Sequence, residues 1–272
     1  MTPNFIGVSG LPRAGSTLLC QLLAQHPDLH CEGNTSPLAT TLLAMRRELS
    51  NSAAMLAQLD NTFAASYGRL ESGMRGFLRG WYADCGKLGV VDKSRAWLQH
   101  VELLLALAPE AKLVICIREL GQVYGSIEAQ HQRTILLDFI DHLADYDRMG
   151  RADMLFGADR TVGSPLAALA AVPDLPEAVR QRLYFVRFED LVAQPAACMA
   201  HLYAWLGLPP YALDPAQLTT GIRESDSHYH MKYLHRQTSQ VGVPAPHAIP
   251  PRIQAQIESA CGWFYQQYYP NK

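Results

Sequence analysis

The feature that most constrains this chain is a glycine-rich turn at residues 10–17, Gly-Leu-Pro-Arg-Ala-Gly-Ser-Thr. The apolar run at residues 5–9 precedes it and predicts a short buried strand. The segment at residues 16–25 predicts a helix, because leucines recur on one face at Leu18, Leu19, Leu22 and Leu23. Backbone N–H groups at the start of a helix attract anions. The sequence therefore predicts a strand, an anion-binding loop and a helix.

The turn is close to a P-loop, G-x-x-x-x-G-K-[ST], but departs from it at one position. Ser16 stands where the P-loop lysine would reach the β- and γ-phosphates, and the cation is Arg13, inside the loop. Arg118 follows the most apolar strand, where a magnesium-binding aspartate would be expected, which leaves Asp92 for that role. These departures favour binding of a phosphate without activation of a γ-phosphate. The alternative is an ordinary glycine joint in an α/β fold.

Strands and helices alternate along the rest of the chain, which predicts one α/β domain over residues 1–272. We expect a three-layer fold with a central parallel sheet. Further strands are predicted at residues 88–91, 112–117 and 183–186. Helices are predicted at residues 36–82, 101–108, 123–132, 195–206 and 253–267, with a mixed helical stretch at 135–156 and a loop at 157–165.

Composition narrows the class of protein. Hydrophobic residues make up 49% of the 272 positions, which excludes a disordered chain. A net charge of −2 argues against a general nucleic-acid binder, although a local basic site is compatible with it. The six cysteines form no CxxC pair, which excludes a zinc motif and a disulfide scaffold. We find no signal peptide and no apolar run of about 18–20 residues, so the expected location is the cytoplasm.

The loop at residues 11–18 resembles the 5′-phosphosulfate loop of the sulfotransferases, P-[KR]-[SA]-G-[ST]-[ST]. These enzymes transfer a sulfuryl group from 3′-phosphoadenosine 5′-phosphosulfate (PAPS) and release 3′,5′-adenosine diphosphate (PAP). The resemblance implies the topology of P-loop nucleotide kinases and explains the missing lysine. It places the 5′-phosphosulfate on the loop residues Arg13, Ala14, Gly15, Ser16, Thr17 and Leu18.

A second landmark lies after the most apolar strand, where Arg118 is followed eight residues later by Ser126. The family binds the 3′-phosphate of the donor with an arginine and a serine at this spacing. A guanidinium grips a phosphate in a bidentate manner, and a hydroxyl adds a donor. The alternative is a surface arginine with a solvated serine.

The third landmark is Asp92-Lys93-Ser94, which follows another predicted strand. Tyrosylprotein sulfotransferases carry Asn-Lys-Asp at the matching place, which implies that Lys93 contacts the transferring group. A lysine there would neutralise charge on the leaving phosphate. The alternative is an exposed Asp92–Lys93 ion pair, and Arg95 and Trp97 are candidates for shaping the pocket. The segment at residues 186–209 also resembles the family, with Phe188 in place of a frequent tyrosine.

Sulfuryl transfer needs a base that takes a proton from the acceptor hydroxyl or amine. Residues 26–35 resemble the tyrosylprotein enzymes, but the position of their catalytic glutamate is Asn34 here. Glu32 is therefore the first candidate for the base, with His30 and His100 as alternatives.

The partners are less constrained by the sequence. The acceptor is expected to be a small molecule, carbohydrate, lipid or peptide, bound by residues 36–82 and 135–165, and a homodimer is one assembly to consider. We expect no metal site, the His-rich segment 228–236 included, and no nucleic-acid or membrane-spanning partner. Two alternatives remain: a small-molecule kinase of the same topology and a nucleotide-binding module without catalysis.

Overall fold

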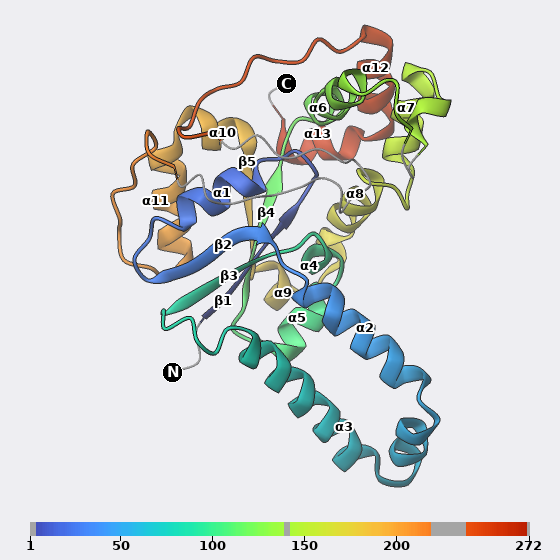
Figure 1. The fold of residues 1–272 in the computed structure, drawn as a ribbon, viewed down its shortest axis with the longest axis vertical. Helices are drawn as coiled ribbons and strands as arrows, with labels where there is room; N and C mark the ends of the chain where they lie inside the picture. The colour runs from blue at the N-terminus through green and yellow to red at the C-terminus, as the bar shows by residue number, and fades with distance from the viewer. Residues whose placement is uncertain (1–3, 139–141, 219–237, 271–272) are drawn as a thin grey trace.

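The computed structural model describes residues 4–138, 142–218 and 238–270. Its centre is a sheet of five parallel strands in the order β2-β3-β1-β4-β5 (Figure 1). The strands are β1 (Asn4–Gly10), β2 (Leu29–Thr35), β3 (Gly89–Lys93), β4 (Lys112–Ile117) and β5 (Leu183–Arg187). This arrangement confirms the predicted α/β class with a central parallel sheet.

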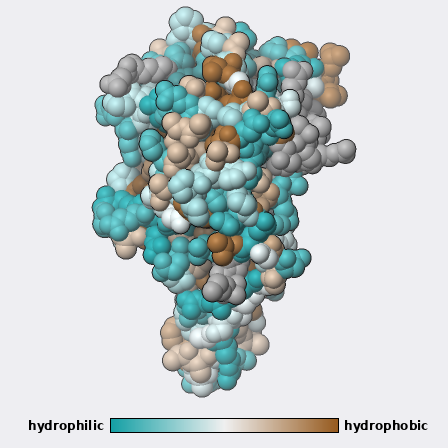
Figure 2. Space-filling view, turned by 90° about the vertical axis from the view of Figure 1, so that its left-hand side faces the viewer, coloured by the Kyte–Doolittle hydropathy of each residue, from teal (hydrophilic) through white to brown (hydrophobic). Residues whose placement is uncertain are grey.

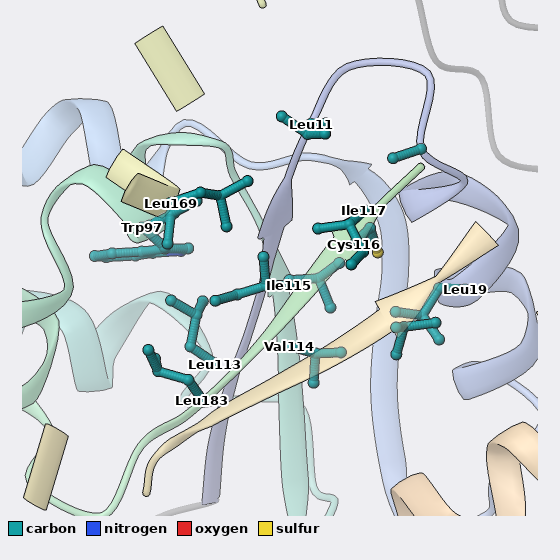
Figure 3. Packing of buried hydrophobic residues seen from close by; sticks show 14 of the residues in the cluster. Leu11, Leu19, Trp97, Leu113, Val114, Ile115, Cys116, Ile117, Leu169 and Leu183 are labelled. Carbon is teal, nitrogen blue, oxygen red and sulfur yellow. The ribbon is translucent and has the colours of Figure 1, made fainter. Parts of the chain in front are cut away.

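The three inner strands β1, β3 and β4 are almost completely buried, as expected for strands covered on both faces. The side chains of β4 alternate between the two layers: Leu113 and Ile115 point toward Trp97, whereas Val114 points toward Leu19 (Figure 3). All five are part of one continuous core. Because the strands are parallel, their carboxyl ends lie along one edge of the sheet.

Helices cover both faces of the sheet (Figure 1). One side holds α1 (Ser16–Leu23), α10 (Phe188–Ala193) and α11 (Pro195–Leu206). The other side holds α4 (Ala96–Gln99), α5 (Val101–Leu107), α8 (Gly163–Ala170) and α9 (Glu177–Arg180). A third group lies near the carboxyl ends of the strands and consists of α6 (Leu120–Arg133), α7 (Arg148–Phe156), α12 (Pro251–Ala260) and α13 (Gly262–Tyr268). Two short 3-10 turns lie at Leu143–Asp145 and Val172–Asp174.

The strand β2 was not among the predicted elements. Its sequence, Leu-His-Cys-Glu-Gly-Asn-Thr, has neither an apolar run nor a regular alternation. It pairs with β3 at the edge of the sheet, and its register is irregular between Cys31 and Thr35. An edge strand of this kind is held by its neighbour rather than by its own pattern, so sequence periodicity does not identify it.

The helical stretch predicted at residues 36–82 forms two helices, α2 (Leu38–Asn51) and α3 (Ala53–Trp81), that project from the body as an arm (Figure 1). The break lies at Ser52, whose hydroxyl caps α3 by accepting from the Met55 N–H at 3.3 Å. Figure 2 shows hydrophilic and hydrophobic side chains mixed over the arm. None of the helices in the described part of the chain is both long and apolar enough to cross a bilayer.

A buried ion pair attaches α6 to α7. The Arg151 guanidinium donates to both carboxylate oxygens of Glu128, at 2.8 and 2.7 Å, and both side chains are less than a tenth exposed. Arg148 Nε adds a third contact at 3.2 Å. Burial alone would raise the pKa of Glu128, but the hydrogen bonds from Arg151 and Gln132 outweigh it and lower that pKa to about 2.

Glu128→Gln should therefore destabilise the fold in a pH-dependent manner. Because the pKa of Glu128 falls from 4.5 to about 2 on folding, its ionised form stabilises the native state above about pH 4.5, and this contribution disappears as the pH falls toward 2. We expect a loss of about 2–3 kcal/mol at pH 7 that shrinks below pH 4.5. Urea unfolding at several pH values measures it, and the exposed Glu177→Gln is the control. A loss independent of pH would contradict the assignment.

Candidate functional site

A cavity of about 410 Å³ lies at the carboxyl ends of β1, β3 and β4, where it is bordered by the glycine-rich loop, α6 and the C-terminal segment. Within the described residues, the charged side chains that line it are all cationic. In the described part of the chain, five basic side chains and no carboxylate contribute to its wall: Arg13, Lys93, Arg95, Arg118 and Arg133. A chain that is nearly neutral overall thus concentrates positive charge in one hollow, which suits an anionic ligand.

The glycine-rich loop is packed tightly on the central strand. Gly10 has a φ of 125°, and a Cβ on this residue would lie 2.1 Å from the Cys116 carbonyl oxygen. The Leu11 N–H donates to the same oxygen at 2.9 Å. At the other end of the loop, Gly15 adopts a φ of 84° and caps the start of α1. Both positions therefore require glycine.

Most of the loop residues predicted to hold the donor line the cavity. Gly15, Ser16, Thr17 and Leu18 do so, together with Arg13. Ala14 differs, because its side chain is buried in the hydrophobic core and does not contribute to the cavity wall.

Arg118 lies where the sequence predicts, directly after β4, and its guanidinium is held on two sides. It lies 4.4 Å from the centre of the Phe188 ring, and its Nη1 donates to the Arg13 carbonyl oxygen at 3.0 Å. Burial lowers the pKa of Arg118, while Glu189 raises it. Among the residues that the structure describes, nothing accepts a hydrogen bond from its buried Nε. A buried donor without an acceptor is costly, which is an independent sign that this guanidinium faces a ligand.

Ser126 lies on α6 and contacts a residue of the glycine-rich loop. Its hydroxyl accepts a hydrogen bond from Arg13 Nε at 3.1 Å. The sequence assigned Arg13 to the 5′ end of the donor and Ser126 to the 3′ end, and the structure brings these two residues into contact. The two predicted anion sites are therefore adjacent parts of one cavity.

Lys93 ends β3 and enters the same cavity, with Nζ donating to Thr17 Oγ1 at 3.2 Å. The side chain of the preceding residue, Asp92, lies on the other face of the sheet. Its carboxylate accepts hydrogen bonds from Tyr82 Oη at 2.7 Å and from Trp97 Nε1 at 2.6 Å. Asp92 is completely buried and Lys93 is 6% exposed. The alternative of an exposed surface ion pair is therefore wrong.

The candidate bases are placed differently from the cations. Glu32 lies on β2 with its side chain 68% exposed, and His30 Nε2 lies 3.5 Å from its Oε1. His100 is half-buried between α4 and α5, where burial and Arg46 lower its pKa. None of these three residues contributes to the described cavity wall.

Several residues of the cavity wall were not predicted as site residues. Gln130 and Arg133 lie four and seven residues after Ser126 on α6. Residues at this spacing share one face of a helix, so both could have been predicted from the position of Ser126. Phe188, which the sequence analysis placed in a structural segment, supports Arg118 and packs on Gly15. His247 comes from the distant C-terminal segment, and nothing in the sequence pairs it with α6.

The predicted absence of a metal site, which included the His-rich segment, is not tested by the described residues. The His-rich segment 228–236 lies outside the described residues. Within the described ranges, the one group of three side chains close enough to share a metal ion is the exposed set Asp138, His142 and Asp145, and none of them lines the cavity. The absence of a functional metal stays a prediction.

Gly10→Ala should disrupt the loop. The new methyl group would collide with the backbone of β4 and force a left-handed conformation on alanine, which should cost roughly 1–3 kcal/mol or more. Gly73→Ala is the matched control, because nothing lies within 4 Å of a Cβ there and alanine in the helix α3 should stabilise by up to about 1 kcal/mol. Urea unfolding compares the two variants. Equal stability of both would show that the loop does not pack on Cys116 as described.

The chain is similar to known proteins of one family. Residues 3–212 match the sequence model of the Sulfotransferase family. Protein-tyrosine sulfotransferase 1 of Danio rerio is 26% identical over 208 residues, which cover 75% of this chain and 53% of that protein. Nodulation protein NoeE of Sinorhizobium fredii (strain NBRC 101917 / NGR234) is 29% identical over 220 residues, which cover 74% of this chain and 49% of that protein. The chain spans about half the length of these curated relatives.

Solved structures share the fold at low sequence identity. The sulfotransferase domain from the curacin biosynthetic pathway superposes with a TM-score of 0.53 at 18% identity, covering 96% of this chain and 98% of that one. Retinol dehydratase in complex with retinol and PAP superposes with a TM-score of 0.50 at 12% identity. The match covers 98% of this chain and 82% of that one. The match of the family model over most of the sequence, together with this fold, shows that the chain belongs to the sulfotransferase family.

Proposed function

We propose that this protein transfers a sulfuryl group from PAPS to a hydroxyl or amine of an acceptor. The observation that carries the proposal is the charge of the cavity wall, which contains five cations and, among the described residues, no carboxylate. A donor with a phosphosulfate and a second phosphate is small and strongly anionic, as this cavity requires. The presence of PAP in the retinol dehydratase structure supports the same ligand class.

The side chains of the cavity fit both charged ends of such a donor. The backbone N–H groups at the start of α1, with Ser16 and Thr17, would hold the 5′-phosphosulfate at the positive end of the helix dipole. Arg118 and Ser126 would hold the 3′-phosphate, which would provide an acceptor for the buried Arg118 Nε. Arg13 contacts Ser126 and belongs to the loop, so it would bridge the two ends.

PAPS supplies the activated sulfuryl group: its sulfur–oxygen bond to the phosphate breaks as the acceptor's oxygen or nitrogen bonds to sulfur. Lys93 is the residue best placed to stabilise the negative charge on the leaving phosphate, because its buried amine lies beside Thr17 of the loop. A positive charge held in a buried site acts more strongly than it would in water. The chain would therefore act through positioning and charge stabilisation.

A kinase of the same topology is the alternative enzyme, and the structure disfavours it at two positions. Ser16 occupies the place of the phosphate-activating lysine, and Asp92 is hydrogen-bonded to Tyr82 and Trp97 in the neighbouring layer rather than lining the cavity. Calorimetric titration with PAP and with Mg²⁺–ATP separates the two functions. Binding of PAP alone is expected, and binding of Mg²⁺–ATP alone would contradict the proposal.

Arg118→Met should weaken PAP binding by about 10- to 100-fold, because it removes charge-assisted hydrogen bonds to a phosphate. Affinity for 5′-AMP, which lacks the 3′-phosphate, should fall much less. Arg182→Met is the matched control: Arg182 lies at the amino end of β5, paired with Glu110, and should leave both affinities unchanged. Equal losses for PAP and 5′-AMP would contradict the assignment of Arg118.

Arg13→Ala should abolish transfer of sulfur-35 from labelled PAPS to acceptors in a cell extract. Its side chain would contact the donor at the junction of its two ends, so both binding and alignment would be lost. If the wild-type chain binds PAP but transfers no label to any extract, the chain is a binding module without catalysis. If Arg13→Ala transfers label at the wild-type rate, the loop assignment is wrong.

Glu32 is our proposal for the base. It lies on β2 three residues before Thr35, which lines the cavity and pairs in register with Lys93. An exposed carboxylate at this edge is open to an acceptor that approaches from solvent.

Once an acceptor is known, Glu32→Gln should lower kcat by about 10²- to 10⁴-fold and leave PAP affinity unchanged. His30→Gln removes the neighbouring imidazole, which is an alternative candidate for the base, and should lower kcat much less. Steady-state kinetics across pH make the comparison. An unchanged kcat and pH profile in Glu32→Gln would place the base elsewhere.

A further inference from the structure

The segment at residues 241–250 lies along α6 and closes one side of the cavity. Both polar atoms of the Gln122 side chain bond to the backbone of His247 in this segment. Nε2 donates to the His247 carbonyl oxygen at 3.1 Å, and Oε1 accepts from the His247 N–H at 2.7 Å. Three prolines, Pro244, Pro246 and Pro250, restrict the backbone of this segment and reduce the entropy lost on ordering it. The segment is therefore a preorganised wall.

His247 is the residue of this wall that reaches the phosphate end of the cavity. It packs over Gly125, where a Cβ would lie 2.5 Å from the His247 Cβ, so the glycine allows the ring to approach next to Ser126. The imidazole lines the cavity together with Arg118, Ser126 and Arg133. These are the side chains that would surround the 3′-phosphate.

The charged groups acting on the ring in the described part of the chain are Arg118 from the end of β4, Arg13 from the loop and Arg133 from α6. Burial lowers the pKa of His247, and the three guanidinium groups lower it further. A phosphate bound among these groups would reverse the balance, since an anion beside an imidazole favours its protonated form.

We propose that His247 is a ligand of the 3′-phosphate that takes up a proton when the nucleotide binds, and so contributes to the selection of 3′-phosphorylated nucleotides. This inference rests on the proposed function. Its consequence is a linkage between pH and affinity: because binding raises the pKa of His247, its contribution is complete below the pKa of the free protein and is lost as the pH rises through that of the complex.

Calorimetry in two buffers of different ionisation enthalpy tests the proposal by counting the protons taken up on binding. The ligands are PAP and 5′-AMP, and the proteins are the wild type, His247→Gln and His247→Lys. The exposed His201→Gln on α11 is the matched control. Since the 3′-phosphate of PAP titrates in the same range, the difference between the wild type and His247→Gln isolates the imidazole.

For the wild type and His201→Gln at pH 6.5, we expect proton uptake with PAP that exceeds the uptake in His247→Gln. His247→Gln should bind PAP roughly tenfold more weakly and bind 5′-AMP as the wild type does. His247→Lys should restore affinity for PAP without the extra proton, because its charge does not depend on pH in this range. Retained affinity for 5′-AMP verifies that the variants keep the cavity.

The outcomes separate this inference from the proposed function. If the wild type binds PAP but His247→Gln matches it in affinity and proton uptake, His247 is not a ligand, while the proposed function stands. The same conclusion follows if His247→Gln loses PAP and 5′-AMP equally, since the residue would then act only on the shape of the wall. If the wild type does not bind PAP at all, the proposed function is wrong and this inference falls with it.

Discussion

The close contact between the glycine-rich loop and β4 sets the geometry on which the site depends. Gly10 brings its backbone so near to Cys116 that no side chain fits between them, and the Leu11 N–H closes the contact with a hydrogen bond. The loop then leads into α1 through Gly15, which precedes the first residue of the helix. Arg13 is carried by this loop, and its carbonyl oxygen in turn holds Arg118. One backbone contact thus positions two cations from different parts of the chain.

Gathering cations in a buried cavity is unfavourable unless the fold holds them in place. The structure does so with neutral and aromatic partners on the cavity side: Arg118 lies on the Phe188 ring, and Lys93 donates to Thr17. Carboxylates lie behind this layer, as Asp92 does where it accepts from Tyr82 and Trp97. Within the described residues, the cavity wall therefore presents cations and no carboxylate. This separation of charge explains how a chain with a net charge of −2 can select a strongly anionic molecule.

The sequence predicted those parts of the fold and of the candidate site that follow from local patterns. Arg118 and Lys93 lie at the ends of apolar strands, and parallel strands bring their carboxyl ends to one edge of the sheet. Gln130 and Arg133 follow Ser126 by helical periodicity and were open to the same reasoning. The edge strand β2 escaped prediction because its pairing with β3, rather than its own pattern, makes it a strand. The position of His247 at the cavity could not be predicted, because its contact with Gln122 joins residues 125 positions apart.

We propose that this cavity holds a nucleotide with its 3′-phosphate beside the end of β4 and its 5′ anion on the glycine-rich loop. A crystal structure of the protein with PAP tests it most directly. We expect the 3′-phosphate within hydrogen-bond distance of Arg118 Nε and Ser126 Oγ, and the 5′-phosphate at the start of α1. A nucleotide bound outside this cavity, or bound in it with its phosphates away from Arg118 and the loop, would contradict the account.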